Sequence, residues 1–185
     1  MDCDAHAIFD IVSHRLPAAG IDAIMIGGHA VNHYGVVRAT QDIDFMITTT
    51  DEHAVRRILR DAGFTNIAVH EMVTFFSRPG SSLRIDFLKV DRSTMDQLLA
   101  NAETIEYFDG HRVKVPRLRD LLAMKLFSLT HGDATRQDKD FPDIVHLVIE
   151  NGVNVETELQ ELSQTFGTDA IYAALSKRIK ELIDA

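Results

Sequence analysis

The sequence predicts an α+β protein in which a mixed β-sheet flanked by helices is followed by a helical C-terminal part. The strand-like segments, which are short apolar or alternating runs, all lie before residue 116, with helical patterns between them. After Pro116 the patterns are helical only, over about 117–131, 141–151, 155–166 and 168–183. We therefore expect an α/β domain over residues 1–115 and a helical subdomain over 116–185.

The elements of the α/β domain follow from local start and stop signals. Pro17 and Gly20 end the first helix, and Gly63 ends the helix that Thr50-Asp51 caps. Asp109-Gly110 predicts a tight turn between the last two strands. In chain order we expect a helix over 4–16, a strand over 22–26, a helix over 29–35, a strand over 42–48, a helix over 52–62, strands over 65–69, 73–77 and 83–90, a helix over 93–101, and strands over 104–108 and 112–115.

The composition describes a soluble protein with a locally basic segment. Hydrophobic residues make up 45% and charged residues 25% of the 185 residues, and the net charge is -9. Residues 111–139 are nevertheless net +4, so the remainder carries -13. Such a segment suits a triphosphate or an RNA backbone, and the alternative is a solvated surface. No apolar run approaches the ~18–20 residues that span a bilayer, and Cys3 is the sole cysteine, so we expect a cytoplasmic protein without membrane contact.

Two acids on one predicted strand are the first candidates for chemistry. Asp42 and Asp44 in Asp42-Ile43-Asp44-Phe45 share one face of the strand, about 7 Å apart. Carboxylates so close need a cation, and oxygen ligands favour Mg²⁺ or Mn²⁺. The alternative is a pair of exposed acids on a half-solvated strand.

A third acid lies in a later strand. Asp86 stands between the apolar residues Ile85 and Phe87. If the two strands are neighbours, the three acids can bind two metal ions about 4 Å apart. The alternative for Asp86 is an ion pair with Arg84 or Arg38.

A glycine pair precedes the acids. Gly27-Gly28 follows a strand and opens a helix, where backbone N–H groups can receive a phosphate. Without the acids the pair would be an ordinary strand–helix turn. Arg38 and Thr40, just before the acids, are expected either to bind phosphate or to fix the loop.

These motifs together resemble the nucleotidyltransferase superfamily related to DNA polymerase β. Its signature is Gly-[Gly/Ser], a spacer, an acid-hydrophobic-acid-hydrophobic strand and a later strand acid. Gly27-Gly28, Asp42-Ile43-Asp44-Phe45 and Asp86 match it, with a spacer at the long end of the family range. The resemblance, which covers roughly residues 22–150, implies a nucleotidyltransferase fold with Asp42, Asp44 and Asp86 as the catalytic and metal-binding residues.

Two branches of the superfamily are similar to this chain. The segments Ile26–Val31 and Arg38–Asp44 look like those of abortive-infection and type IV toxin–antitoxin toxins, and like those of small lincosamide and aminoglycoside nucleotidyltransferases. Lys125 and the segment 136–143 resemble the Lys and Arg-x-Lys-Asp element of the toxin branch.

The C-terminal motif can be examined by helix geometry. Lys125 falls inside an apolar stripe of the helix over 117–131, so it must either extend to solvent or point into a polar cleft, where we expect it to bind the triphosphate. Asp140 lies on the line of the apolar residues of the next helix, but Pro142 favours a helix start there. Asp140 is therefore either a site residue or a helix cap. Lys139 is expected at the nucleotide, with surface charge as the alternative.

The sequence thus predicts a metal-dependent nucleotidyltransferase that uses two Mg²⁺ or Mn²⁺ ions and an NTP donor, with ATP binding expected. Gly27, Gly28, Arg38, Thr40, Lys125, Lys139 and Asp140 are the predicted nucleotide-binding residues. The acceptor is expected to be an RNA end, as for a toxin with an antitoxin-like partner. The alternatives are a small-molecule antibiotic acceptor and a non-catalytic nucleotide-binding module.

Overall fold

The structure, a computed structural model, describes residues 3–184 and divides into two compact units. The first unit runs to Ala30 and resumes over Ala39–Arg117, and the second comprises Val31–Arg38 and the chain from Leu118 onward. The sequence led us to expect two uninterrupted parts. The contacts instead group the short segment Val31–Arg38 with the C-terminal helices.

Within residues 3–184, the first unit holds one seven-stranded sheet with the order β3-β4-β5-β2-β1-β7-β6. The sheet is mixed, because β2 pairs in parallel with β5 and β1 with β7, whereas the other pairs are antiparallel. The strands are β1 (Ile24–Met25), β2 (Asp42–Thr48), β3 (Asn66–Val69), β4 (Val73–Ser77), β5 (Arg84–Val90), β6 (Glu103–Phe108) and β7 (His111–Val115).

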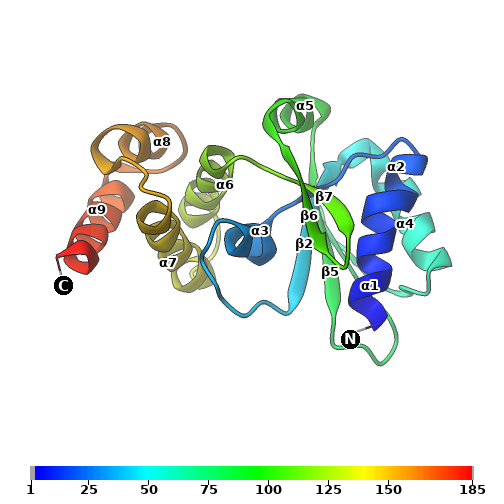
Figure 1. The fold of residues 1–185 in the computed structure, drawn as a ribbon. Helices are drawn as coiled ribbons and strands as arrows, with labels where there is room; N and C mark the ends of the chain where they lie inside the picture. Colours follow the sequence, from blue (N-terminus) through cyan, green and yellow to red (C-terminus); the bar gives the residue numbers. More distant parts are fainter. Residues whose placement is uncertain (1–2, 185) are drawn as a thin grey trace. The chain divides into compact units, whose positions relative to one another are not determined.

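Helices cover one face of this sheet and bury its apolar residues. Figure 1 shows α1, α2 and α4 together on that face, and the core beneath them includes Phe9, Val55, Phe45 and Phe87. Alternation along β2 directs Ile43, Phe45 and Ile47 into this core. The helical segments are α1 (Cys3–Asp10), the π-helix η1 (Ile11–Arg15), α2 (Leu16–Ala18), α3 (Gly27–His33, which continues into the second unit), the 3-10 helix η2 (Thr49–Asp51), α4 (Glu52–Asp61) and α5 (Arg92–Asn101).

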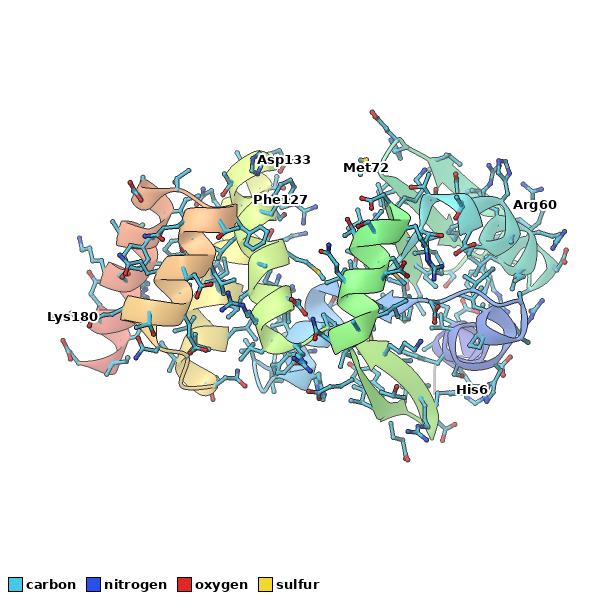
Figure 2. The ribbon with its side chains drawn as sticks, turned by 90° about the horizontal axis from the view of Figure 1, so that it is seen from above. His6, Arg60, Met72, Phe127, Asp133 and Lys180 are labelled. Atoms are coloured by element: carbon cyan, nitrogen blue, oxygen red, sulfur yellow. The ribbon has the colours of Figure 1, made fainter. Side chains whose placement is uncertain are left out.

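The second unit is helical, with α6 packed on α7 and α8, and α7 packed on α9. In Figure 2, Phe127 of α6 and Asp133, just after that helix, are labelled at the same end of the unit. No helix in the part of the chain that the structure describes is long and apolar enough to cross a membrane. The segments are α6 (Leu118–His131), α7 (Thr135–Glu150), the π-helix η3 (Val155–Leu159), α8 (Gln160–Phe166) and α9 (Asp169–Ile183).

The start of α7 corrects the sequence prediction. We expected this helix to begin near residue 141, but it begins at Thr135 and contains Pro142. The Asp133 carboxylate accepts a hydrogen bond from the Thr135 N–H (3.0 Å) and so satisfies a free donor at the helix start. Proline removes the hydrogen bond to the carbonyl of Asp138 four residues earlier, and Asp138 is exposed to water.

From the packing of the core, we expect Phe45→Ala and Phe127→Ala to differ widely in their effect on the free energy of unfolding. Phe45 is fully buried and stacks on Phe87, with 5.8 Å between ring centroids. Phe45→Ala should lower the free energy of unfolding by about 3–5 kcal/mol, measured by urea denaturation. Phe127→Ala, at a ring that is 54% exposed, is the control and should change it by less than about 1 kcal/mol. Equal losses would contradict this description of the core.

Candidate active site

The parallel pairing of β2 with β5 brings the three predicted acids together. Asp44 lies opposite Asp86, and Asp42 lies opposite Arg84. All four side chains point away from the apolar core, because alternate residues such as Ile43 and Ile85 fill it. One face of the sheet therefore builds the core and the other carries the acids.

The same register extends the acid face over two further strands. Across β3, β4, β5 and β2, one row reads Ala68, Phe75, Asp86, Asp44. The adjacent row reads Asn66, Ser77, Arg84, Asp42. Aromatic, amide and hydroxyl groups thus lie on the same face as the carboxylates.

Arg84 bridges two of the acids. Its Nε donates to Asp86 Oδ1 (2.8 Å), and its Nη2 donates to Asp86 Oδ2 (2.9 Å) and to Asp42 Oδ2 (2.7 Å). The guanidinium also lies over the Phe75 ring, 4.7 Å from its centroid. Of the two ion pairs considered for Asp86, the one with Arg84 is present, whereas Arg38 pairs with Asp143.

Asp86 is buried, and this burial perturbs its carboxyl. Burial is the largest cause and raises the pKa of its carboxyl to about 6. The hydrogen bond and the charge of Arg84 lower this pKa, whereas the negative charges of Asp44 and Asp42 raise it. Burial alone would lower the pKa of Arg84. The hydrogen bond and charge of Asp86, with the charges of Asp42 and Asp44, outweigh this burial and raise that pKa.

Gly27 is required where it stands, directly beside Asp44. Its φ of 62° lies in the left-handed region, and a Cβ built there would overlap the Asp44 carboxylate. The backbone is tied at the same place, since the Ile26 N–H donates to the Asp44 carbonyl (2.9 Å). Gly28 follows in the first turn of α3. The first glycine of the predicted pair is therefore in contact with Asp44.

The acids fit a divalent cation in chemistry. Asp42, Asp44 and Asp86 offer only oxygen atoms, the donors that Mg²⁺ and Mn²⁺ prefer, and the Asp44 carboxylate occupies the space where a side chain at Gly27 would begin. Within residues 3–184, no three acidic, histidine or cysteine side chains already converge as a metal site. The Arg84 guanidinium instead contacts Asp42 and Asp86 and supplies positive charge beside them.

Arg38 and Thr40 both make hydrogen bonds to residues near them in the chain. The Asn32 side chain holds the Arg38 backbone, with its Nδ2 donating to the carbonyl and its Oδ1 accepting from the N–H, each at 3.1 Å. The Thr40 hydroxyl donates to the Asp42 carbonyl (3.1 Å). These contacts are local in the chain, and both roles considered for Arg38 and Thr40, loop fixing and phosphate binding, stay predictions.

Lys125 lies in a buried ion-pair network of the second unit. Its Nζ contacts Asp140 Oδ1 (2.9 Å) and Asp143 Oδ2 (2.7 Å), and Arg38 pairs with Asp143 through its Nε (2.8 Å) and Nη2 (3.0 Å). These carboxylates explain how a lysine is accommodated within an apolar stripe. A contact of Lys125 with the triphosphate stays a prediction.

Asp140 is not a helix cap. It lies inside α7, which begins at Thr135, and its side chain is buried. The capping alternative is therefore wrong. A role of Asp140 at the nucleotide stays a prediction.

Other residues of the second unit border a shallow hollow. Arg38 and Lys139 both line a cavity of about 390 Å³, together with Val37, Pro142 and His146. Lys139 is exposed, and its predicted nucleotide contact is untested.

Sequence reasoning missed Asp143 and Phe75. For Asp143, the signal available was its position three residues after Asp140, which places both on one face of a helix. For Phe75, the signal was the alternation of Val73, Phe75 and Ser77 along a strand.

Comparison with known proteins assigns the family. The profile of the nucleotidyl transferase AbiEii toxins of type IV toxin–antitoxin systems matches residues 11–183. The chain belongs to this family. The predicted superfamily and its toxin branch are thereby confirmed, and this AbiEii-family chain is a nucleotidyltransferase. A search of curated proteins gave no match.

Solved structures confirm the predicted fold class. The solution structure of the antibiotic-resistance factor ANT(2'')-Ia is similar with a TM-score of 0.64 and 12% identity, covering 98% of this chain and all of that one. An antigenic nucleotidyltransferase-like protein from Paracoccidioides brasiliensis gives 0.55 and 18%, covering 94% and 93%. The lincosamide adenylyltransferase LnuA, bound to lincomycin, gives 0.52 and 16%, covering 80% and 96%. The AbiEii-family chain therefore has a nucleotidyltransferase fold.

The contact between Gly27 and Asp44 can be tested against a matched glycine. Gly27→Ala should both strain the backbone, by ~1–2 kcal/mol, and displace the Asp44 carboxylate, so nucleotidyl transfer should fall ~100-fold or more. Gly20→Ala is the control, because Gly20 also has a positive φ (73°) but no atom within 4 Å of an added Cβ. Denaturation and pyrophosphate release measure the two effects. Equal activity in the two variants would contradict the contact.

The buried ion pairs predict a strong effect at Lys125. Lys125→Met leaves Asp140 and Asp143 with less compensation in the interior, so the free energy of unfolding should fall by ~3–5 kcal/mol. The control is Lys177→Met, whose side chain is 79% exposed beside Glu181 and should cost less than ~1 kcal/mol. Calorimetry or urea denaturation measures both. A loss at Lys125 no larger than at Lys177 would show that the network is not stabilising.

Proposed function

We propose that this nucleotidyltransferase moves an NMP from an NTP to a hydroxyl of an RNA end, in a reaction that depends on Mg²⁺ or Mn²⁺. The observation that carries the proposal is the placement of Asp42, Asp44 and Asp86 on one sheet face, with Gly27 against Asp44. Three carboxylates in this arrangement suit phosphoryl chemistry, in which positioning and charge neutralisation dominate.

The residues have separate roles in the proposed reaction. Asp42, Asp44 and Asp86 hold the metal, which when bound neutralises charge on the reacting phosphates. The backbone N–H groups of Gly27 and Gly28, in the first turn of α3, bind the β and γ phosphates. The acceptor oxygen forms a bond to the α phosphorus, the bond from that phosphorus to the bridging oxygen breaks, and pyrophosphate leaves.

Asp86 accepts the proton of the acceptor hydroxyl. Burial raises the pKa of its carboxyl above the usual range of aspartic acid, toward the values that suit a general base. Arg38, Thr40, Lys125, Lys139 and Asp140 belong to the proposal as nucleotide-binding residues, on the basis of the sequence motif alone.

We propose RNA rather than a cationic drug as the acceptor because of the residues on the strands next to Asp86. A cavity of about 490 Å³ lies over β3 and β4, lined in part by Asn66, Phe75, Ser77 and Arg84. Its lining residues include a cation, an amide and an aromatic ring but no carboxylate, which suits a nucleotide better than a polycation. The glycine pair follows β1, on the opposite side of β2, and so leaves this side to the acceptor.

The family also supports a protein partner. Type IV toxins are paired with antitoxins, so we propose that an antitoxin-like protein opposes this enzyme. An antibiotic acceptor, as in the ANT(2'')-Ia complex with adenylyl-2''-tobramycin, is the alternative that the assay must separate.

Incorporation of labelled nucleotide tests the proposal directly. Wild-type protein with Mg²⁺ should label total tRNA from one or more NTPs and should not label an aminoglycoside or lincosamide panel. Asp44→Asn, which keeps the side-chain size but removes the charge, should reduce labelling ~100-fold or more.

Other outcomes would replace the proposal. Labelling of a drug alone would favour antibiotic resistance. NTP binding without pyrophosphate release, for every acceptor, would favour a non-catalytic module.

A further inference from the structure

We propose that Arg84 is a positioning residue that acts as an internal counter-ion: its guanidinium holds Asp42 and Asp86 when no metal is bound and must withdraw from them when the metal binds. The inference rests on the proposed metal-dependent function and adds a control of metal binding to it. It makes Arg84 a competitor of the metal for the same carboxylates.

The contacts of Arg84 occupy the atoms that the metal would need. Both Asp86 oxygens accept from Arg84, at 2.8 and 2.9 Å, and Asp42 Oδ2 accepts at 2.7 Å. Planar, bidentate pairing of this kind is among the strongest side-chain interactions of a carboxylate. Metal ligation by Asp86 therefore exchanges these hydrogen bonds for metal–oxygen bonds.

Arg84 is the partner that can move. Its side chain is 44% exposed, whereas that of Asp86 is 9% exposed on the same strand. The arginine also lines the open cavity over β3 and β4, which provides space for the guanidinium after it leaves the acids. Phe75 continues to support it from below, with the 4.7 Å stacking contact as the anchor.

The charges explain why such a residue is needed. Asp42, Asp44 and Asp86 lie at neighbouring positions of paired strands, and like charges so close repel. Arg84 offsets part of that repulsion without metal, and a divalent cation offsets more. Removing Arg84 should therefore weaken the metal-free protein and strengthen metal binding at the same time.

Another arginine of the first unit provides a matched control. Arg78 pairs with Asp4 (2.7 Å) and lies 4.7 Å from the Phe64 ring centroid, so it combines the same two interactions at a carboxylate outside the candidate site. Arg84→Met and Arg78→Met remove equivalent groups. They differ in whether the carboxylates of the candidate site are involved.

The experiment is a Mn²⁺ titration of the full chain by calorimetry, with thermal midpoints measured in EDTA and in saturating Mn²⁺. Arg84→Met should bind Mn²⁺ ~5–100-fold more tightly than wild type, the range usual for coupled ligands. Its thermal midpoint should fall in EDTA and recover in Mn²⁺. Arg78→Met should lower the midpoint equally in both and leave the Mn²⁺ affinity unchanged.

Unchanged or weaker Mn²⁺ binding by Arg84→Met would overturn the inference, as would equal losses of its midpoint with and without the metal. If Arg84→Met does not fold, Arg84→Lys serves instead, because a single ammonium cannot reproduce the bidentate contact and should bind Mn²⁺ more tightly than wild type. Labelling of tRNA is read separately. A protein that shows these metal effects but transfers no nucleotide would contradict the proposed function alone.

Discussion

Repulsion among carboxylates is the constraint on which the site of this protein depends. Asp42, Asp44 and Asp86 lie on one face of two paired strands, so their negative charges gather at neighbouring positions of the sheet. The sheet therefore separates its two faces, with aromatic and aliphatic side chains on one and acids on the other. Gly27 and Arg84 both follow from this constraint, since one provides space beside an acid and the other provides charge.

The second unit meets a similar requirement with different residues. Asp140 and Asp143 are buried on α7, where a charged carboxylate without a partner would be very costly. Lys125 from α6 and Arg38 from the segment before β2 compensate them. In both units an arginine contacts a carboxylate through two nitrogen atoms, and in both it is more exposed than the acid it serves.

Much of this arrangement could be predicted from sequence because its signals are local. Alternation over Asp42–Phe45 indicated β2, and the spacing of Gly27-Gly28 from Asp42 and Asp44 identified the superfamily. The start of α7 could not be found in this way. In the sequence Pro142 indicates a helix start more strongly than Asp133, whose carboxylate accepts from the Thr135 N–H where the helix begins. The ion pair between Arg38 and Asp143 could not be predicted either, because the two residues are 105 positions apart in the chain.

The path of the chain has a consequence for how such proteins can diversify. Because Val31–Arg38 belongs with the C-terminal helices, the helical unit is encoded in two separate stretches. Recombination at a single point after Arg117 would deliver Asp143 without the arginine that compensates it. Lineages that exchange this unit must therefore transfer both stretches together or replace the buried acid, which favours gradual divergence over the shuffling of modules.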